Sequence, residues 1–447
     1  MKKFGLLIVT MLFAFNSGIQ AQNVDDTDTE ITVTNKKGEK EVIDLPEALS
    51  FEYDSLLSVY NAKTYLKRDV NCDKPDINPV YEKEVYKERL SRIPSVMEMP
   101  YNDVVQKLID RYSGHLRRSV SLMLGTQNFY MPIFEEALES YGLPLELKYL
   151  PVIESALNPN AVSRVGATGL WQFMLHTGKQ YGLEINSLVD ERRDPIKASY
   201  AAAHYLSDLY KIFGDWNLVI AAYNCGPQGI NKAIHRAKGL TDYWDIYPYL
   251  PKETRGYVPA FIAANYIMNY YCDHNICPMI AELPAKTDTV MIDRDVHFEQ
   301  IAKVLNIDIN IVKDLNPQYR RNIINGSSKL SALRLPTQKI AQFIDLQDSI
   351  YACTVDNFQN KRTEVEIDNS TPQYSQSTSR TSRSSSKASS RSRKRSKKSR
   401  RGKSVTIRQG DTLSEIAARN GTTVSKLKKL NRISGSSIRA GKKIKVK

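Results

Sequence analysis

The sequence predicts a mainly α-helical domain followed by a small α+β module with the order strand, helix, helix, strand. The chain has 447 residues, of which 41% are hydrophobic, enough for two to four domains with at least one sizeable core. Apolar residues recur at helical spacing between about 100 and 275. A basic, Ser-rich tract then interrupts the chain, and an ordered pattern returns only in the last 44 residues, 404–447.

The first residues have the parts of a secretory signal peptide. Lys2 and Lys3 precede a largely apolar run from Phe4 to Phe15, and a polar stretch leads to Ala21. Because this run is too short to span a bilayer comfortably, we expect cleavage after Ala21 and export to the periplasm or cell envelope. An uncleaved membrane anchor is the alternative. No later segment is predicted to be transmembrane.

The helical domain is predicted over residues 96–278. Before it, residues 22–95 are weakly periodic, and we expect a poorly ordered lead-in followed by a short helical packing segment. Trp216–Tyr223 and Tyr257–Tyr271 are apolar enough to be buried helices. The clearest helix runs from Ile196 to Ile212, where one apolar stripe contains Ala198, Ala201, Ala202, Tyr205, Leu206, Leu209 and Ile212.

Cysteine usage indicates neither a disulfide-built fold nor a metal centre. The five cysteines are too few for a disulfide framework, and an odd number leaves at least one thiol unpaired. Cys272 and Cys277 are close enough in sequence to bridge. His274 lies between them, but no fourth ligand follows at a convincing spacing, so we predict no metal site. The other cysteines are Cys72, Cys225 and Cys353.

Charge is distributed unevenly, although the formal net charge is +14. Residues 378–403 hold 12 basic and no acidic residues, and residues 404–447 hold 11 basic and 2 acidic ones. The rest of the chain is therefore net acidic. Residues 338–403 are predicted to be a linker that becomes a disordered basic Ser/Arg-rich tract. This tract is either a solvated linker or a site that attracts anionic envelope polymers. Export makes nucleic acid an unexpected partner, and we expect a monomer.

Two small modules are predicted after the helical domain. The first covers residues 285–337, with a helix at Asp308–Leu315 and a closing strand at Leu333–Pro336. The second covers residues 404–447. Its predicted elements are a strand at Val405–Arg408, a helix opened by a capping box of Thr412 and Glu415 and ended at Gly421, a helix at Val424–Leu430 and a strand at Lys443–Val446.

One carboxylate stands at the end of an apolar stripe. Pro144 suits the first turn of a helix, whereas Pro151 is expected to bend it. Burial at such a position raises the pKa of a carboxyl group, and a neutral carboxylic acid can protonate a glycosidic oxygen. A lone Glu on such a face also fits an ion pair or a helix end. The residues that share the face are Leu143, Leu147, Leu150 and Glu154.

Three sequence motifs indicate a function for the apolar face that ends at Glu154. Together, in this order, they resemble those of the lytic transglycosylases, which are lysozyme-like enzymes. The resemblance covers roughly residues 100–275 and does not extend to residues 22–95. The motifs are Glu154-Ser155 followed by Asn158-Pro159-Asn160-Ala161 and Gly169-Leu170-Trp171-Gln172-Phe173-Met174, then Ala222-Tyr223-Asn224-Cys225-Gly226-Pro227, and finally Glu253-Thr254-Arg255-Gly256-Tyr257-Val258.

The resemblance implies a role for each matching residue. Glu154 corresponds to the catalytic acid/base. Ser155 and Gln172 correspond to residues that line the cleft near it, Tyr223 and Asn224 to the pair that contacts the sugar, and Tyr257 to the tyrosine that orients the glutamate. Trp171 and Cys225 depart from the family's more common Met and Ala. No cofactor is implied.

The implied reaction cleaves the bond between N-acetylmuramic acid and N-acetylglucosamine without water and leaves a 1,6-anhydro ring. Because the attacking oxygen belongs to the sugar, one protein carboxylate suffices, whereas most glycosidases use two. Asp190, Glu191 and Asp194 are therefore predicted to be helix-start and surface residues. Two alternatives stay open: a lysozyme-type muramidase and a non-catalytic protein that binds peptidoglycan.

The last module resembles a LysM domain, a family that binds glycans containing N-acetylglucosamine. The resemblance implies a groove between the turn Gly410-Asp411-Thr412-Leu413 and the loop from Asn431 to Ile433. Asp411 and Thr412 also fit a simple helix cap. The segment 285–337 resembles a degenerate repeat of the same kind. It lacks the Gly-Asp-Thr turn, so glycan binding by it is an open question. Peptidoglycan strands are the partner that these resemblances imply.

Overall fold

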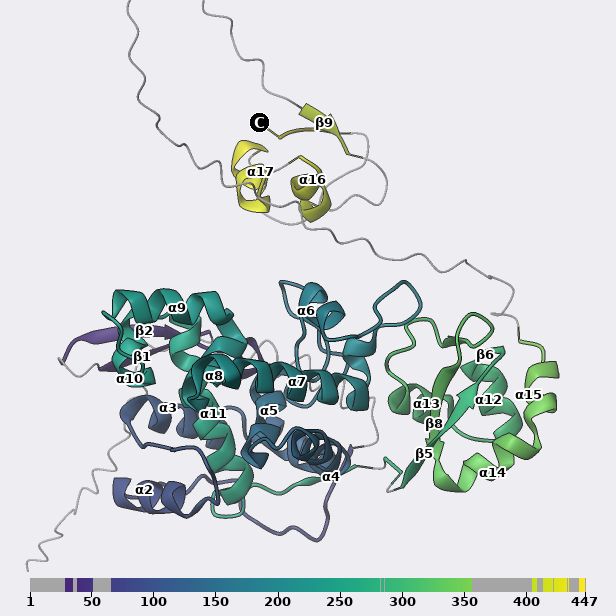
Figure 1. Cartoon of the computed structure of the whole chain (residues 1–447), viewed down its shortest axis with the longest axis horizontal. Coiled ribbons are helices and arrows are strands. Elements are labelled where there is room, and N and C mark those ends of the chain that lie inside the picture. The colour runs from purple at the N-terminus through teal and green to yellow at the C-terminus, as the bar shows by residue number, and fades with distance from the viewer. Residues whose placement is uncertain are drawn as a thin grey trace, which may run out of the picture. The chain divides into compact units, whose positions relative to one another are not determined.

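The computed structural model describes residues 29–34, 38–50, 66–281, 283–284, 286–355, 404–407, 413–420, 422–431, 433 and 442–446. These residues fall into two compact units that divide at Pro372. The first unit holds the helical domain and the first small module, and the second holds the last module (Figure 1). The predicted signal peptide and the basic tract lie outside the described residues. Among the described helices, none is both long and apolar enough to cross a membrane.

An antiparallel hairpin is the first described part of the first unit, and it lies where the sequence led us to expect a poorly ordered lead-in. Strands β1 (Glu30–Thr34) and β2 (Lys40–Asp44) pair with Ile31 opposite Ile43. Ile31 and Val33 alternate with polar residues along β1, and Ile43 is the buried residue of β2, so this face of the hairpin packs against α3 (Asp103–Ser113) and α11 (Lys252–Tyr270). A short 3-10 helix, η1 (Glu47–Leu49), follows and packs on α5 (Leu150–Ser155). The alternation was the signal in the sequence, but five-residue strands are too short to stand out.

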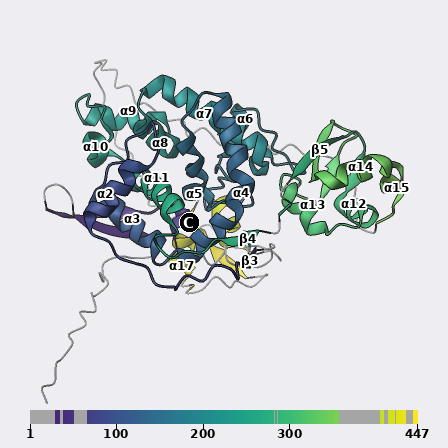
Figure 2. The ribbon, with the colours of Figure 1, turned by 90° about the horizontal axis from the view of Figure 1, so that it is seen from below.

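Helices make up the rest of the domain, and Figures 1 and 2 show them gathered around α11. This helix is buried over most of its length and packs against α3, α5 and α8. Two short strands, β3 (Leu66–Arg68) and β4 (Met279–Ala281), pair beside α4. The helices are α2 (Lys83–Arg92), α3 (Asp103–Ser113), α4 (Arg117–Ser140), η2 (Leu145–Tyr149), α5 (Leu150–Ser155), α6 (Leu175–Gln180), η3 (Glu191–Arg193), α7 (Pro195–Phe213), α8 (Trp216–Cys225), α9 (Pro227–Arg236), α10 (Tyr243–Ile246), η4 (Tyr247–Tyr249) and α11 (Lys252–Tyr270).

Helix α7 forms where the apolar stripe predicted it. The Asp194 carboxylate caps the helix by accepting hydrogen bonds from the amides of Ile196 (2.9 Å) and Lys197 (3.1 Å). Small buried alanines let α4 and α8 approach closely. The predicted buried stripe wrongly included Ile212, which is 57% exposed and lies on the solvent side of the last turn.

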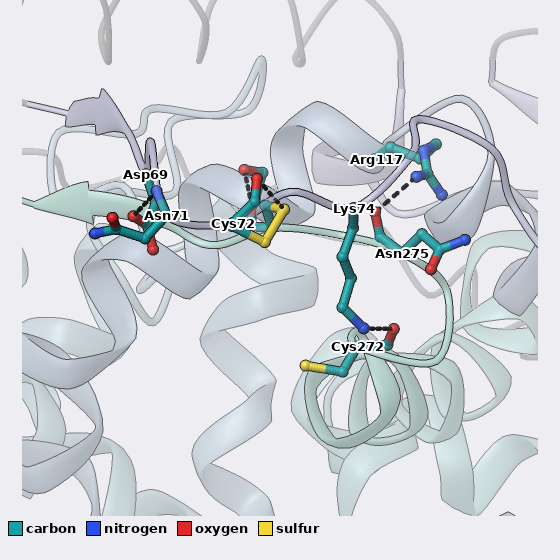
Figure 3. Close-up of a disulfide and its surroundings, with 9 residues drawn as sticks. Asp69, Asn71, Cys72, Lys74, Arg117, Cys272 and Asn275 are labelled. Atoms are coloured by element: carbon teal, nitrogen blue, oxygen red, sulfur yellow. Dashed lines mark hydrogen bonds between the residues drawn. A yellow bond between two sulfur atoms is a disulfide. The ribbon is translucent and has the colours of Figure 1, made fainter.

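A disulfide joins Cys72 to Cys277, so the bridge between Cys272 and Cys277 that their spacing allows does not form. Figure 3 shows the Cys272 sulfur lying apart from this bridge, and the carbonyl oxygen of Cys272 accepts a hydrogen bond from Lys74 (2.7 Å). His274 is fully buried between Asn78 and Tyr266, and burial lowers the pKa of its imidazole to about 4. It is a core histidine, and no metal-binding cluster occurs within the described ranges.

Removing this bridge should lower stability. The two cysteines are 205 residues apart, so the bridge closes a long loop in the unfolded chain and reduces its entropy. Replacing Cys72 and Cys277 together by Ser is expected to lower the free energy of unfolding by about 2–4 kcal/mol. Chemical denaturation measures the change, with Cys272→Ser as the matched control. An equal loss in that control would contradict the pairing.

The first small module has the predicted helix before residue 316 and the predicted closing strand that ends at Pro336, and then continues. Helices α14 (Thr337–Asp345) and α15 (Gln347–Ala352) follow, where the sequence analysis expected a linker from residue 338. Their apolar residues Phe343 and Ile350 complete the core of the module. The other elements are β5 (Thr287–Ile292), β6 (Asp295–His297), α12 (Phe298–Leu305), α13 (Ile309–Leu315), β7 (Ile323–Asn325) and β8 (Ser331–Pro336), with β5 paired to β8 and β6 to β7.

The second unit has the same core arrangement. Its elements are β9 (Ser404–Thr406), α16 (Leu413–Arg419), α17 (Val424–Asn431) and β10 (Lys443–Lys445), and β9 pairs with β10. The predicted capping residue Thr412 and the predicted helix stop at Gly421 lie outside the described residues.

Candidate active site

Glu154 lies in the last turn of a short helix that ends abruptly. The preceding segment is the 3-10 helix η2, and α5 begins at Leu150. Pro151 therefore occupies the first turn of α5, where it disrupts no helical hydrogen bond, and it does not interrupt the middle of a helix as the sequence analysis expected. Ala156 and Leu157 then adopt left-handed backbone conformations (φ 47° and 59°) that end the helix.

The apolar residues before Glu154 are buried, although they do not belong to one continuous α-helix. Leu147 and Leu150 are completely inaccessible to solvent, and Leu143 is 9% exposed. They anchor η2 and the start of α5 in the core, so the end of α5 has a fixed position. Glu154 itself is half-buried at that end.

Tyr257, on α11, is hydrogen-bonded to Glu154. The tyrosine is 1% exposed, and its hydroxyl donates to Oε1 of the carboxylate. Burial raises the pKa of Glu154 from 4.5 to about 8, and this effect outweighs the hydrogen bond from Tyr257, which favours the ionised form. Burial and the neighbouring Glu154 also raise the pKa of Tyr257 well above its ordinary value. Near neutral pH the pair therefore holds a carboxylic acid beside a neutral phenol.

This protonation state predicts how activity depends on pH. A group that must donate a proton is active only while protonated, so kcat/KM should fall as pH rises through about 8. The same shift acts on stability, because the folded protein binds this proton more tightly than the unfolded chain. Glu154 should thus destabilise the fold progressively between pH 4.5 and about 8. A pH–rate profile whose alkaline limb lies near 4.5 would contradict this protonation state.

A loop made of residues 158–173 follows the left-handed turn at the end of α5. Two antiparallel bridges, Val162 to Thr168 and Thr168 to Phe173, give it a fixed shape. Gln172 has a left-handed backbone (φ 47°), and its side-chain amide donates to the carbonyl oxygens of Gly169 (2.8 Å) and Ala161 (3.3 Å). A non-glycine residue in this conformation carries strain, which is common at functional sites.

The buried side chains of Ser155 and Trp171 fasten this loop to the protein core. Ser155 is completely buried, and its hydroxyl lies 2.9 Å from the carbonyl oxygen of Leu170 and 3.0 Å from that of Pro151. Trp171 is also completely buried and donates through Nε1 to Ser199 (2.9 Å). The sequence analysis placed Ser155 along the cleft. In the structure its hydroxyl faces backbone inside the core, so it acts on the site through the loop.

The second motif reaches the site through α8. Tyr223 is half-buried, and its hydroxyl donates to the carbonyl oxygen of Trp171 (2.8 Å). Burial, followed by the charge of Glu154, raises its pKa well above the ordinary value. Asn224 accepts a hydrogen bond from Thr254 (2.8 Å). Thr254 is a positioning residue that the sequence analysis did not single out, although its motif contained it.

Glu253 is the acidic residue whose charge acts on Glu154. It is exposed at the start of α11, and its negative charge contributes to the raised pKa of Glu154. The sequence analysis considered acids close in sequence, and the structure assigns those to other partners. Asp190 pairs with Arg192 (2.8 Å), and Glu191 pairs with Lys197. Asp190, Glu191 and Asp194 do stand at helix starts, but they are buried rather than on the surface.

The predicted LysM residues are only partly described, because Gly410, Asp411 and Thr412 lie outside the described ranges. Leu413 is buried in the core of the second unit, and Ile433 packs against that core. The Asn431 amide donates to the carbonyl oxygens of Leu427 (2.9 Å) and Lys445 (2.8 Å), and its oxygen accepts from the Lys445 amide (2.8 Å). Its side chain therefore fastens α17 to β10.

Comparison with protein families assigns three segments. Residues 131–245 match the transglycosylase SLT domain. Residues 286–352 match the LysM-like domain described for lytic transglycosylase MltD, and residues 405–447 match the LysM domain. The first match contains Glu154, Gln172 and Asn224, and the second extends through α14 and α15.

Individual proteins match over different lengths. Membrane-bound lytic murein transglycosylase D of Escherichia coli (strain K12) is 27% identical over 354 residues, covering 78% of this chain and 70% of that protein. Soluble lytic murein transglycosylase of the same strain is 33% identical over 143 residues, covering 31% of this chain and 21% of that protein. The crystal structure of the 70 kDa soluble lytic transglycosylase from Escherichia coli matches 33% of this chain and 25% of that chain, with 29% identity and a TM-score of 0.29.

The three domain matches occur in one chain and in the order found by sequence analysis, and a relative that matches 78% of this chain is a lytic murein transglycosylase. The chain therefore carries a transglycosylase SLT domain followed by a LysM-like and a LysM domain, and it is similar over most of its length to a lytic murein transglycosylase.

Proposed function

We propose that this protein cleaves the β-1,4 bond between N-acetylmuramic acid and N-acetylglucosamine in peptidoglycan and leaves 1,6-anhydromuramic acid ends. The observation that supports this most strongly is Glu154 at the end of α5, hydrogen-bonded by Tyr257 and with a pKa that burial raises to about 8, because one carboxyl group can serve both halves of the reaction. The protein would act after export, in the periplasm or at the cell envelope.

In the first half, Glu154 donates its proton to the glycosidic oxygen as the bond to the muramic acid C1 breaks. In the second half, the Glu154 carboxylate takes the proton of the C6 hydroxyl as that oxygen bonds to C1. The carboxyl group is regenerated, and no water is consumed. General acid catalysis of this kind contributes about 10²–10⁴-fold to the rate.

The neighbours of Glu154 would hold the sugar and the acid in register. Tyr257 orients the carboxyl group through its hydroxyl, and the Gln172 side chain holds the loop of residues 158–173 in a fixed shape. Asn224, fixed by Thr254, keeps the two protons of its amide nitrogen available to sugar oxygens, because only its oxygen is bound in that contact. Tyr223 braces the loop from α8.

Digestion of purified sacculi followed by mass spectrometry of the released muropeptides tests the proposal. Anhydro products are lighter by one water molecule than the reducing products of a muramidase. Anhydro ends from the wild type support the proposal. Reducing ends would identify a hydrolase, for which Glu253 is the second carboxylate to test, and no release would leave a protein that only binds the wall.

The C-terminal LysM domain is proposed to hold the enzyme on the wall, and the basic tract before it would strengthen attraction to anionic envelope polymers. Ending the chain after residue 403 removes most of a separate compact unit. Retention on sacculi should fall, whereas kcat on a short soluble glycan should stay unchanged. A pelleting assay and a solution assay measure the two effects, and undiminished retention would contradict this role.

A further inference from the structure

The LysM-like module is bound to the catalytic domain through backbone atoms. Val189 in the catalytic domain forms an antiparallel bridge with Tyr319, which follows α13 of the module. The Asp190 amide donates to the carbonyl oxygen of Gln318 (2.9 Å), and the Arg320 amide donates to that of Leu188 (2.9 Å). Two backbone hydrogen bonds of this kind fix both position and direction.

Side chains extend this contact. Val189 packs against the hydrophobic core of the module. The Arg320 guanidinium donates to the carbonyl oxygen of Asn186 (3.3 Å), and Lys329 donates to Glu184. The centre of the contact excludes water, because Asp190 is 2% and Gln318 is 6% exposed. This combination of apolar burial and satisfied backbone groups is typical of a fixed interface.

The contacted segment is joined to the loop of the active site through the side chain of Arg192. Asp190 binds Arg192 through both carboxylate oxygens (2.9 and 2.8 Å). The same guanidinium donates to the carbonyl oxygens of Gly166 and Phe173, each at 3.1 Å. Arg192 thus ties the two ends of residues 166–173 to the segment that the module holds. The Arg192 carbonyl oxygen also packs directly against Gly169.

Residues 166–173 in turn determine the surroundings of Glu154. They contain Gln172, and the carbonyl oxygen of Leu170 lies 2.9 Å from the hydroxyl of Ser155, the residue after Glu154. The carbonyl oxygen of Trp171 accepts from Tyr223. An unbroken series of short contacts therefore runs from the module to the residue beside the catalytic acid.

We propose that the LysM-like module is an internal brace, which positions residues 166–173 for catalysis by holding residues 186–192. Val189 is a positioning residue in this arrangement. Asn316 of the module makes the same contacts as Asn431 of the C-terminal LysM domain. Its amide donates to the carbonyl oxygens of Val312 and Arg334, and its oxygen accepts from the Arg334 amide, each at 2.8 Å. In this module, however, the loop that follows the second helix is already occupied by the catalytic domain.

The first test is Val189→Asp in the full chain, with Val189→Ile as the conservative control. A carboxylate cannot remain against the core of the module, so the contact should open. Hydrogen–deuterium exchange should speed up in peptides covering residues 318–320 and also in those covering residues 166–173. The value of kcat should fall about tenfold or more, because small displacements of positioning groups reduce rates steeply. Val189→Ile should keep both the exchange rates and kcat at their wild-type values.

Arg320→Ala is the second variant and guards against a folding failure of the first. Arg320 is exposed, so its removal leaves both cores intact. Faster exchange in residues 166–173, smaller than in Val189→Asp and reversed in Arg320→Lys, supports the brace. An opened contact at residues 318–320 with unchanged exchange at 166–173 and unchanged kcat would overturn it. The effect on kcat rests on the proposed function. The exchange data do not, so they separate failure of the brace from failure of the proposed reaction.

Discussion

The Glu154→Gln variant should lose at least about 10³-fold in kcat while its retention on sacculi stays unchanged. Glutamine has almost the same shape as the carboxyl group and still accepts the hydrogen bond from Tyr257, so the surrounding loop should not move. It cannot deliver a proton to the glycosidic oxygen or take one from the C6 hydroxyl. Both halves of the proposed reaction are therefore affected. Muropeptide release under single-turnover conditions measures the loss.

Glu253→Gln is the matched control for this variant. It removes a nearby carboxylate that raises the pKa of Glu154 but does not serve as the acid in our account. Most activity should remain, and the alkaline limb of the pH profile should move to lower pH. Equal losses in the two variants would indicate a mechanism with two carboxylates and would contradict the single-acid proposal.

Gly169→Ala should lower both stability and activity strongly, although it adds only one methyl group to the loop. The backbone at Gly169 has φ +88°, a conformation that favours glycine, and a β-carbon there would lie 1.8 Å from the carbonyl oxygen of Arg192. Neither backbone can yield without breaking the contacts between residues 166–173 and Arg192. We expect the free energy of unfolding to fall by about 3 kcal/mol or more, and kcat to fall with it.

Gly182→Ala separates the two causes. Gly182 has a similar backbone conformation (φ +84°), but a β-carbon there would meet no atom within 4 Å. It should therefore carry only the conformational cost, about 1–2 kcal/mol, and leave kcat unchanged. Chemical denaturation and a muropeptide assay on both variants measure the difference. Similar stability losses in the two would show that the close approach of Arg192 is unimportant.

Local patterns predicted the elements that depend on local sequence. The stripe from Ala198 to Leu209 and the capping role of Asp194 are both present in α7. The two buried leucines before Glu154 also lie in the core, although a 3-10 helix replaces the expected first turns. Spacing alone did not reveal that change, because residues three apart, such as Leu147 and Leu150, share a face in both kinds of helix.

Features that depend on contacts between distant residues were not accessible in this way. Cys72 pairs with Cys277 because the chain before α2 returns to the end of α11, and no spacing in the sequence records that. Glu253 and Thr254 lie about 100 residues after Glu154 and reach the site only through the start of α11. The bridge between Val189 and Tyr319 joins two loops, where sequence periodicity carries no information.

The central claim is that Glu154 is protonated near neutral pH, and infrared difference spectroscopy of wild type against Glu154→Gln tests it most directly. The spectrum isolates the carboxyl C=O band of this one residue and follows its loss as pH rises. Our account predicts that the band disappears with a midpoint near pH 8. A midpoint close to 4.5, the ordinary value for a glutamic acid, would contradict it.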